Sequence, residues 1–328
     1  MNFIIFGGEG FIGHHLINHI EKIIDQKSKI YSVDLKKKNV LNNSRIFFNG
    51  DVRNRISLDI SNLSSSIIYN LAAVHKTPGH KDNEYYETNV LGAINICQFA
   101  RDNNINTIVF TSSIAPYGAS EDLKEENSIP MPNTPYGISK LVAEYIHKVW
   151  QAEMPNNRKL IIVRPGVVFG EAEEGNFTRL YQSLKKGVFF YPGRKNTLKA
   201  AVYVKDVARI LYETSLNEKP GVCIFNLTYH PAPTIKYICD SISNVMHLKS
   251  PNILIPGSLL KVAAAGIYYT GFFVGKKING IHPDRVKKLM ISTNISGEKL
   301  AHSQYALKFS LEEAIRDWRN DCDGKGLN

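Results

Sequence analysis

The chain has few cysteines and no pattern that would organise them into a site. Four occur in 328 residues, at Cys97, Cys223, Cys239 and Cys322. No two of them form a CxxC pair, and their spacings fit neither a zinc site nor a disulfide framework. We therefore expect a reducing, cytoplasmic location and no bound metal.

Long charged runs and low-complexity tracts are absent as well. The formal net charge is +10, but the basic residues occur only in short pieces such as KKK at 36–38. This distribution argues against nucleic-acid binding and is compatible with an anionic small substrate. The N-terminal stretch NFIIFGG has no basic segment before it, so we expect no signal peptide.

One apolar stretch, 253–275, is about long enough to span a bilayer. It contains Pro256, Lys261 and four glycines, which weaken a membrane-spanning helix. We expect it to form a buried or peripheral helix of the globule rather than a membrane contact.

The first half of the chain alternates short apolar runs with helical patterns. Strands are predicted at 2–8, 29–35, 45–52, 66–74, 107–113 and 159–170, and helices at 11–24, 89–104 and 137–153. This order predicts an α/β fold with a doubly wound parallel sheet over 1–170. The pattern becomes irregular over 171–328, which predicts a smaller, mixed C-terminal lobe. Segments at about 200–230, including a strand at 223–228, are expected to return to the main sheet.

The glycines of GGEGFIG stand where the first strand meets the first helix. Gly7, Gly10 and Gly13 at such a turn let the backbone approach a pyrophosphate. The helix that begins at Phe11 and Ile12 supplies free N–H groups and positive potential. The motif therefore predicts a Rossmann dinucleotide site.

Asp34 follows Gly13 by 21 residues, at the end of the second strand. A carboxylate there accepts hydrogen bonds from the adenosine ribose and repels a 2′-phosphate, so it favours NAD over NADP. The lysines at 36–38 leave NADP as an alternative. Further cofactor contacts are expected after the next strands, at Asp51 and Val52 beside the adenine and at Leu71, Ala72 and Ala73 over a strand end.

Tyr136 and Lys140 stand four residues apart in TPYGISK, so they share one helix face. A free tyrosine titrates near pH ~10, too high for a base at neutral pH. A neighbouring ammonium and a positive nicotinamide ring both favour the phenolate, so they would lower the pKa of Tyr136. Ser113, at a strand end, can hydrogen-bond the same substrate oxygen. We therefore expect Tyr136 to be an acid/base in hydride chemistry.

These motifs resemble those of the extended short-chain dehydrogenase/reductase family, and within it the NAD-dependent sugar-nucleotide epimerases and dehydratases. The matching pieces are GGEGFIG, VDL, GDV, NLAA, ETNVLGAINI, FTSSIAPYG, TPYGISK, RPGVVFG and AVYVKDVARIL. The resemblance implies a catalytic Ser113–Tyr136–Lys140 triad with Asn89 as a supporting polar residue. It also implies that 1–170 binds NAD and that 171–328 binds the nucleotide diphosphate of the substrate. A homodimer built on helices 89–104 and 137–153 is the family's habit.

The same resemblance suggests contacts to the substrate. Asn176 and Arg285 match family positions that bind the diphosphate, and Lys199 stands where many relatives carry an arginine. His75 is expected in the substrate pocket without proton chemistry.

Three reactions can be weighed on this scaffold. Dehydratases of the family carry an Asp-Glu pair straight after the serine or threonine, whereas Ile114 and Ala115 follow Ser113 here. Elimination of water is therefore disfavoured. We expect an epimerase that transiently oxidises the sugar at C4, in polysaccharide biosynthesis. A 4-keto sugar-nucleotide reductase or other dehydrogenase is the alternative, ahead of a sterol-type dehydrogenase or a non-catalytic NAD-sensing regulator.

Overall fold

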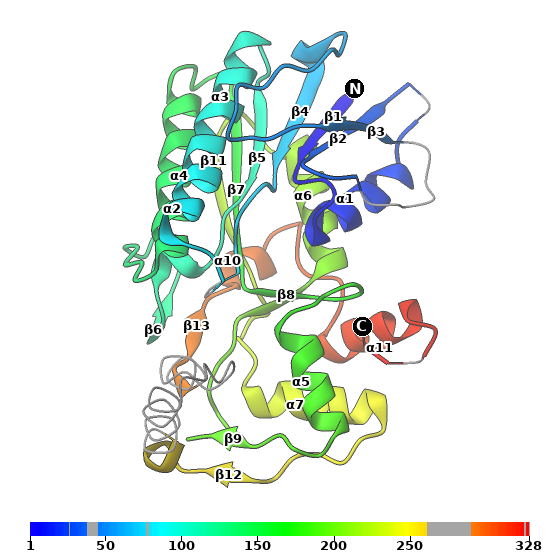
Figure 1. Cartoon of the computed structure of the whole chain (residues 1–328), viewed down its shortest axis with the longest axis vertical. Coiled ribbons are helices and arrows are strands. Elements are labelled where there is room, and N and C mark those ends of the chain that lie inside the picture. Colours follow the sequence, from blue (N-terminus) through cyan, green and yellow to red (C-terminus); the bar gives the residue numbers. More distant parts are fainter. Residues whose placement is uncertain (26, 38–44, 77–78, 261–289, 325, 328) are drawn as a thin grey trace, which may run out of the picture.

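The structure is a computed structural model that describes residues 1–25, 27–37, 45–76, 79–260, 290–324 and 326–327. Its central element is a seven-stranded sheet in the order β11-β7-β5-β4-β1-β2-β3, with every neighbouring pair parallel. The strands are β1 (Asn2–Phe6), β2 (Lys29–Asp34), β3 (Arg45–Asn49), β4 (Ser66–Asn70), β5 (Thr107–Thr111), β7 (Lys159–Pro165) and β11 (Gly221–Leu227). Since all run the same way, their carboxyl ends share one edge, which faces the smaller lobe (Figure 1).

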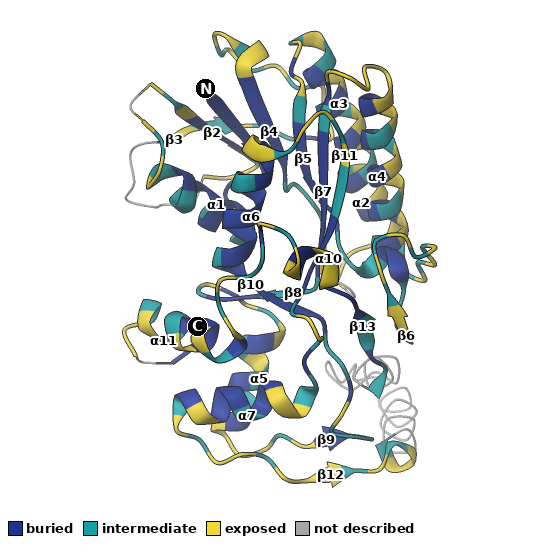
Figure 2. Ribbon diagram, turned by 180° about the vertical axis from the view of Figure 1, so that it is seen from behind, coloured by how far each residue is buried: buried dark blue, intermediate teal, exposed yellow. Residues whose placement is uncertain are grey.

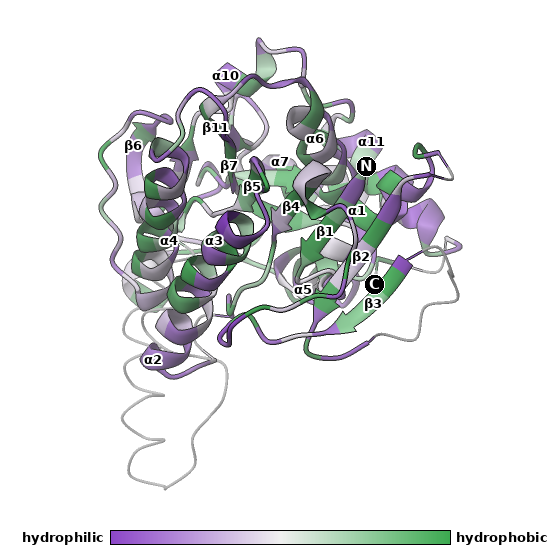
Figure 3. Cartoon of the chain, turned by 90° about the horizontal axis from the view of Figure 1, so that it is seen from above, coloured by the Kyte–Doolittle hydropathy of each residue, from purple (hydrophilic) through white to green (hydrophobic). Residues whose placement is uncertain are grey.

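Helices cover both faces of this sheet (Figure 3). The helices α1 (Phe11–Glu21) and α6 (Val204–Asn217) pack on one face, and α3 (Gly92–Asp102) and α4 (Pro135–Ala152) on the other. Side chains of β1 alternate between the two cores: Phe3 and Ile5 join the first, Ile4 and Phe6 the second. All four are almost completely buried, as the near-continuous apolar strand predicts. The prediction of a doubly wound parallel sheet is confirmed.

The first five predicted strands end one to four residues earlier than expected, and two other predicted elements differ more. The single strand expected over 159–170 is two strands, because β8 (Val167–Phe169) leaves the main sheet and pairs with β10 (Ala201–Tyr203). Gly166 stands between β7 and β8, and a Cβ on it would lie 2.6 Å from the carbonyl carbon of Ala200. The helix expected over 89–104 starts earlier, as α2 (Asp82–Tyr85) and a π-helix, η2 (Tyr86–Leu91), which lead into α3.

The smaller lobe has its own core below the carboxyl edge of the sheet (Figure 2). It contains α5 (Asn176–Lys185), α7 (Ile235–Met246) and α11 (Leu311–Asp321), whose side chains enclose Phe169, Tyr203 and Trp318. Short strand pairs complete it, with β9 (Tyr191–Pro192) beside β12 (Leu254–Ile255) and β6 (Ser120–Lys124) beside β13 (Thr293–Ile295). The remaining short elements are η1 (Leu63–Ser65), η3 (Ala115–Tyr117) and α10 (Glu298–Ala301).

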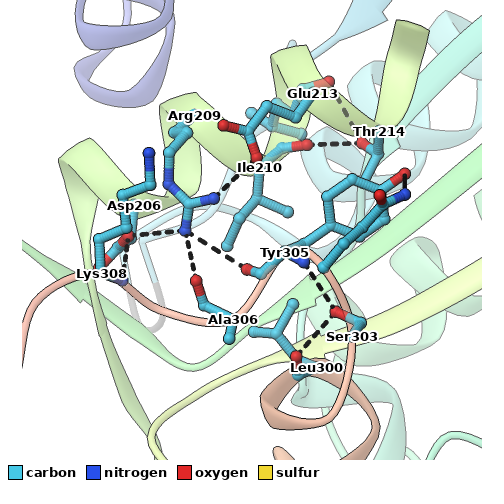
Figure 4. A network of polar contacts seen from close by, with 12 residues as sticks. Asp206, Arg209, Ile210, Glu213, Thr214, Leu300, Ser303, Tyr305, Ala306 and Lys308 are labelled. Carbon is cyan, nitrogen blue, oxygen red and sulfur yellow. Dashed lines mark hydrogen bonds and ion pairs between the residues drawn. The ribbon is translucent and has the colours of Figure 1, made fainter. Parts of the chain in front are cut away.

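A buried carboxylate joins α6 to the segment that leads into α11 (Figure 4). Asp206 accepts a hydrogen bond from Arg209 Nη2 at 2.9 Å and another from the backbone N–H of Lys308 at 2.9 Å. The same guanidinium donates to the carbonyl of Ala306 at 2.7 Å. The C-terminal segment is therefore fixed to α6, a helix that packs on the main sheet, by hydrogen bonds from and to charged side chains.

No helix in the described part of the chain is long and apolar enough to cross a membrane. Most of the apolar stretch 253–275 lies outside the described residues.

We expect Asp206→Ala to lower the free energy of unfolding by about 3–5 kcal/mol, since it removes the buried carboxylate partner of Arg209 and leaves that guanidinium only the more exposed Glu213. Glu213→Ala removes the other, more exposed partner of Arg209 and should cost about 1 kcal/mol or less. Urea unfolding of both variants measures the difference. Equal losses would show that the Asp206 network does not fix the C-terminal segment.

Candidate active site

The glycine turn after β1 brings three backbone segments into contact. Gly7 has a positive φ of 80°, and a Cβ on it would lie 2.8 Å from the backbone nitrogen of Ala72. A Cβ on Gly13 would lie 2.4 Å from the carbonyl oxygen of Gly7. Only glycine allows both approaches. The first turn of α1 therefore lies directly against the loop, as dinucleotide binding requires.

The N-terminus of α1 is open to a ligand. Gly10 caps the helix without a side-chain hydrogen bond to it. The N–H groups of the first turn, beginning at Phe11 and Ile12, have no carbonyl partner within the helix. Together with the helix dipole they fit a pyrophosphate.

Asp34 ends β2 beside this turn. Its carboxylate accepts hydrogen bonds from the backbone N–H of Glu9 at 3.1 Å and of Leu35 at 2.7 Å. A carboxylate offers about four lone-pair sites, so the oriented side chain can also accept from ribose hydroxyls. The turn, the helix end and Asp34 together fit NAD.

Glu9, within the glycine turn, has buried hydrogen-bond partners that sequence analysis missed. Its carboxylate accepts from Ser32 Oγ at 2.6 Å and from Arg45 Nη2 at 3.0 Å, and both ionic side chains are only 3% exposed. The pair ties the glycine turn to β2 and β3. The acidic Glu9 inside a glycine motif was a signal that a buried partner exists. The sequence did not identify that partner, because Arg45 lies 36 residues away.

The loop after β3 presents Asp51 with its carboxylate held by Arg53. The guanidinium donates from Nη2 at 2.6 Å and from Nε at 2.9 Å, and these hydrogen bonds lower the pKa of Asp51. Val52 is buried, and its carbonyl accepts from Asn95 Nδ2 at 2.8 Å. Their contacts to adenine therefore stay predictions.

Asn89 holds the loop that follows β4. Its Oδ1 accepts from the N–H of Val74 at 2.9 Å, and its Nδ2 donates to the carbonyl of Val74 at 3.1 Å and to Ser139 Oγ at 2.9 Å. The clamp joins the loop of Leu71, Ala72 and Ala73 to α4. Asn89 lies inside the π-helix η2, whose extra residue per turn is typical of functional positions.

Ser113 and Tyr136 meet at the carboxyl edge of the sheet. The Ser113 hydroxyl lies beside the Tyr136 phenol, where hydrogen bonding acts to lower the pKa of Tyr136. The Ser113 Oγ also accepts from the N–H of Ala115 at 3.1 Å. Thr134 caps α4 by accepting from the N–H of Gly137 at 3.1 Å, and a Cβ on Gly137 would lie 2.7 Å from the carbonyl oxygen of Ala115. The first turn of α4 therefore packs closely on the loop after β5.

Lys140 is buried one turn further along α4. Its Nζ donates to the carbonyl of Thr111 at 2.8 Å and stands 4.8 Å from the centre of the Phe110 ring. Burial lowers the pKa of Lys140 to about 7, and the charge of Glu144 opposes this. Burial also lowers the pKa of His75, and the Lys140 charge adds to that shift, so His75 lies near this ammonium.

The pKa of Tyr136 moves in the direction opposite to the sequence-based expectation. Burial raises it, the hydrogen bond from Ser113 opposes the rise, and Tyr85 adds to it. The Tyr85 ring, which sequence analysis did not single out, lies 6.2 Å from the Tyr136 ring, centre to centre. The expected lowering rests on a positive nicotinamide ring as well as on Lys140, and the protein alone does not produce it.

A buried ion pair lies behind the triad and was also missed. Arg164 donates to Glu144 from Nη2 at 2.6 Å and from Nε at 2.9 Å, and Ser112 Oγ donates to the same carboxylate at 2.6 Å. The exposed fractions of the Arg164 and Glu144 side chains are 3% and 0%. Because Ser112 precedes Ser113 and Glu144 follows Lys140 by one turn, the pair connects both arms of the triad.

The three expected substrate contacts lie in the smaller lobe or outside the described residues. Asn176 begins α5, and its Oδ1 accepts from Arg179 Nη2 at 3.0 Å. Lys199 Nζ donates to the carbonyl of Ile291 at 2.8 Å, and burial lowers its pKa to about 8. Arg285 lies outside the described residues. Their roles stay predictions.

The lowered pKa of the buried Lys140 predicts how the free energy of unfolding depends on pH. Its pKa of about 7 in the folded chain is below the unfolded value near ~10.4, so between these values the unfolded chain binds more protons. The contribution of Lys140 to the free energy of unfolding therefore rises with pH over this range. We expect the free energy of unfolding of Lys140→Met, relative to that of wild type, to be highest at or below pH ~7. This difference should shrink toward pH ~10.

Chemical unfolding of both proteins, without cofactor, at several pH values measures this difference. Lys148→Met on the same helix is the control and should show no such trend. A pH-independent difference between Lys140→Met and wild type would contradict the shifted pKa.

Comparisons with known proteins agree with this geometry. The chain is 26% identical over 320 residues to the N-acetyl-α-D-glucosaminyl-diphospho-ditrans,octacis-undecaprenol 4-epimerase of Escherichia coli O157:H7, covering 96% of this chain and 93% of that protein. It is 30% identical over 224 residues to a putative UDP-glucose 4-epimerase of Methanocaldococcus jannaschii, covering 63% and 70%.

Solved structures show the same fold. The UDP-glucose 4-epimerase of Thermotoga maritima with UDP-glucose superposes with a TM-score of 0.74 at 17% identity over 99% of both chains. The UDP-glucuronic acid 4-epimerase of Bacillus cereus in complex with NAD superposes with a TM-score of 0.71 at 16% identity, over 98% of this chain and 99% of that one.

The family model described as the NAD dependent epimerase/dehydratase family matches residues 3–227, about two thirds of the chain. This range contains the glycine turn, Asp34 and the Ser113–Tyr136–Lys140 residues. The resemblance seen in the sequence, the NAD cofactor and the assignment as an enzyme of the short-chain dehydrogenase/reductase type are thereby confirmed. The chain belongs to the NAD-dependent epimerase/dehydratase family.

Proposed function

We propose that this chain is an NAD-dependent 4-epimerase of a diphosphate-linked sugar. The observation that carries the proposal is the placement of the Ser113 hydroxyl beside the Tyr136 phenol, at the same sheet edge as the glycine turn and Asp34. Bound NAD supplies a hydride acceptor that becomes a donor for the return step. Gly7, Gly10, Gly13 and Asp34 would hold it, with Phe11, Ile12 and the loop residues Leu71, Ala72 and Ala73 beside it.

The proton chemistry belongs to the side chains of the triad. Tyr136 takes the proton of the sugar C4 hydroxyl as the carbon is oxidised, and it returns the proton when the carbon is reduced from the other face. Ser113 donates a hydrogen bond to the oxygen that changes between hydroxyl and ketone. Lys140 adds positive charge on the same helix face. Because proton and hydride both return, the reaction has no net redox change.

The residues after Ser113 favour this reaction over elimination of water. Ile114 packs with Tyr117, Ala200 and Ile295, and Ala115 has no proton to donate from its side chain. The segment therefore offers no acid for a leaving hydroxyl. A 4-ketoreductase uses the same triad and remains the alternative function, distinguished by its net consumption of reduced cofactor.

The substrate carrier has two candidates. Several curated relatives are UDP-glucose 4-epimerases, and those of M. jannaschii and Yersinia pestis match 63% and 69% of this chain. The E. coli relative, named for a lipid-diphosphate sugar, matches 96% of it. Its match extends through the smaller lobe, where we propose that the carrier binds. Both carriers place a diphosphate beside the sugar, where Lys199, Asn176 and Arg285 would bind it.

A substrate panel tests the function and separates these candidates. We expect UDP-N-acetylglucosamine, UDP-glucose or N-acetylglucosaminyl-diphospho-undecaprenol to give its C4 epimer, read by chromatographic separation of the released sugars, without net change in NADH absorbance. Stoichiometric NADH consumption with a 4-keto sugar, and no epimer, would replace the proposal by the reductase.

We expect Tyr136→Phe to lower kcat by about 100-fold to 10,000-fold, because a general acid/base contributes a factor of this size. NAD affinity should stay close to that of wild type, measured by isothermal titration calorimetry. Tyr145→Phe, on the exposed side of the same helix, is the matched control and should keep full turnover. Turnover by Tyr136→Phe at the wild-type rate would remove Tyr136 from its role.

We also propose a cytoplasmic homodimer formed through α3 and α4. These helices lie side by side at the surface of the molecule (Figure 3) and carry exposed Leu91, Ile94, Tyr145 and Val149 around them. A second copy would bury these side chains in a bundle of helices. Sedimentation of the purified chain as a monomer at micromolar concentration would contradict this.

A further inference from the structure

The far end of the smaller lobe exposes an unusual set of large apolar side chains. This end lies at β9 and β12, away from the main sheet (Figures 1 and 2). The side chains that we name the lobe-end patch, with their exposed fractions, are Val188 (64%), Phe190 (37%), Ile253 (62%) and Leu259 (62%). They come from two chain segments, so the patch is built by the fold and not by one local run.

Backbone hydrogen bonds hold the two segments together. The N–H of Tyr191 donates to the carbonyl of Ile253 at 2.8 Å, and the N–H of Gly193 donates to the carbonyl of Ile255 at 2.9 Å. The Tyr191 side chain is buried beneath, while its neighbour Phe190 faces outward. The exposed side chains are therefore carried by an ordered strand pair over the core of the lobe, and exposed apolar surface of this kind marks interaction sites.

Positive charge surrounds the patch. Lys185, Lys186 and Lys249 are exposed at this end of α5 and α7, and Lys195 donates to Asn252 Oδ1 at 2.7 Å. No aspartate or glutamate occurs over 175–205 or 241–260. The nearest acidic side chains on packed elements are already paired, Asp240 with Lys236 and Glu121 with Arg194. This end of the lobe therefore combines exposed apolar side chains with lysines.

We propose that the lobe-end patch docks on the surface of an anionic phospholipid bilayer. Apolar side chains that enter the headgroup boundary, with lysines that meet anionic lipid, are the two components of interfacial membrane binding. The net charge of +10 adds long-range attraction to such a surface. A second copy of the chain is the less favourable occupant, because a symmetric contact would place two surfaces of the same positive charge against each other.

This proposal differs from the sequence-based expectation for 253–275, which favoured a buried or peripheral helix. It concerns only Ile253 and Leu259 of that stretch, together with residues of the β9 segment. A docked protein would meet a sugar carried on a lipid diphosphate at the membrane itself. The docking proposal does not depend on which carrier the enzyme uses.

The test is cosedimentation of the full chain, without substrate, with large unilamellar vesicles. One set contains phosphatidylcholine alone and the other also contains phosphatidylglycerol. We expect binding to the anionic vesicles that falls as salt is added, and little binding to the neutral ones. Lys185→Glu/Lys186→Glu and Phe190→Ser/Ile253→Ser/Leu259→Ser should each weaken the vesicle partition coefficient by at least about tenfold.

Controls of equal chemistry come from the opposite, amino edge of the sheet. Lys22→Glu/Lys27→Glu and Ile23→Ser alter exposed residues there and should bind vesicles with less than about a threefold change. NAD affinity of every variant, measured in solution, shows that the fold is intact. Wild-type vesicle binding by both lobe-end variants would overturn the proposal. So would a change in their oligomeric state without any change in vesicle binding, which would identify the patch as a contact between copies.

Discussion

The buried carboxylate of Glu144 is the constraint on which the arrangement of the site depends. It accepts from Ser112 on the β5 side and from the Arg164 fork on β7, while it belongs to α4. Removing one partner of such a pair leaves a buried charge uncompensated, at a cost of about 3–5 kcal/mol. The carboxylate therefore fixes α4 relative to the sheet edge, and with it the positions of Tyr136 and Lys140 relative to Ser113.

The same network extends from the sheet toward the smaller lobe. Arg164 also donates to the Tyr117 hydroxyl at 2.6 Å, and that hydroxyl donates to Asn226 Oδ1 at 2.9 Å. The Asn226 amide in turn donates to the carbonyl of Ser296 at 3.1 Å, just before α10. One continuous chain of hydrogen bonds thus connects β5, α4, β7 and β11 to the late segment that pairs with β6. In a low-dielectric interior such a network favours a single arrangement of its members.

The distance along the chain between interacting residues decides whether the sequence could predict their interaction. The glycine turn, Asp34 and the Tyr136–Lys140 spacing are local features, because a strand end or one helix turn places their residues together. The pairs Glu9–Arg45 and Glu144–Arg164 join residues 36 and 20 positions apart on different elements, and no periodicity indicates such partners. The break at Gly166 was missed for a related reason: apolar residues on both sides read as one strand, while the contact with Ala200 that requires the glycine is long-range.

The electrostatics of the triad place a condition on the proposed chemistry. Burial raises the pKa of Tyr136 and lowers that of Lys140 to about 7, so burial opposes the charged form of both groups. A phenol that keeps its proton cannot accept one from a sugar. Under the proposed function the acid/base pair therefore needs an additional positive charge beside it, which NAD would supply if Asp34 and the glycine turn hold it as proposed. In the proposed mechanism, proton transfer by Tyr136 would in this way be coupled to an occupied cofactor site, which suits a reaction that must return its hydride before the product leaves.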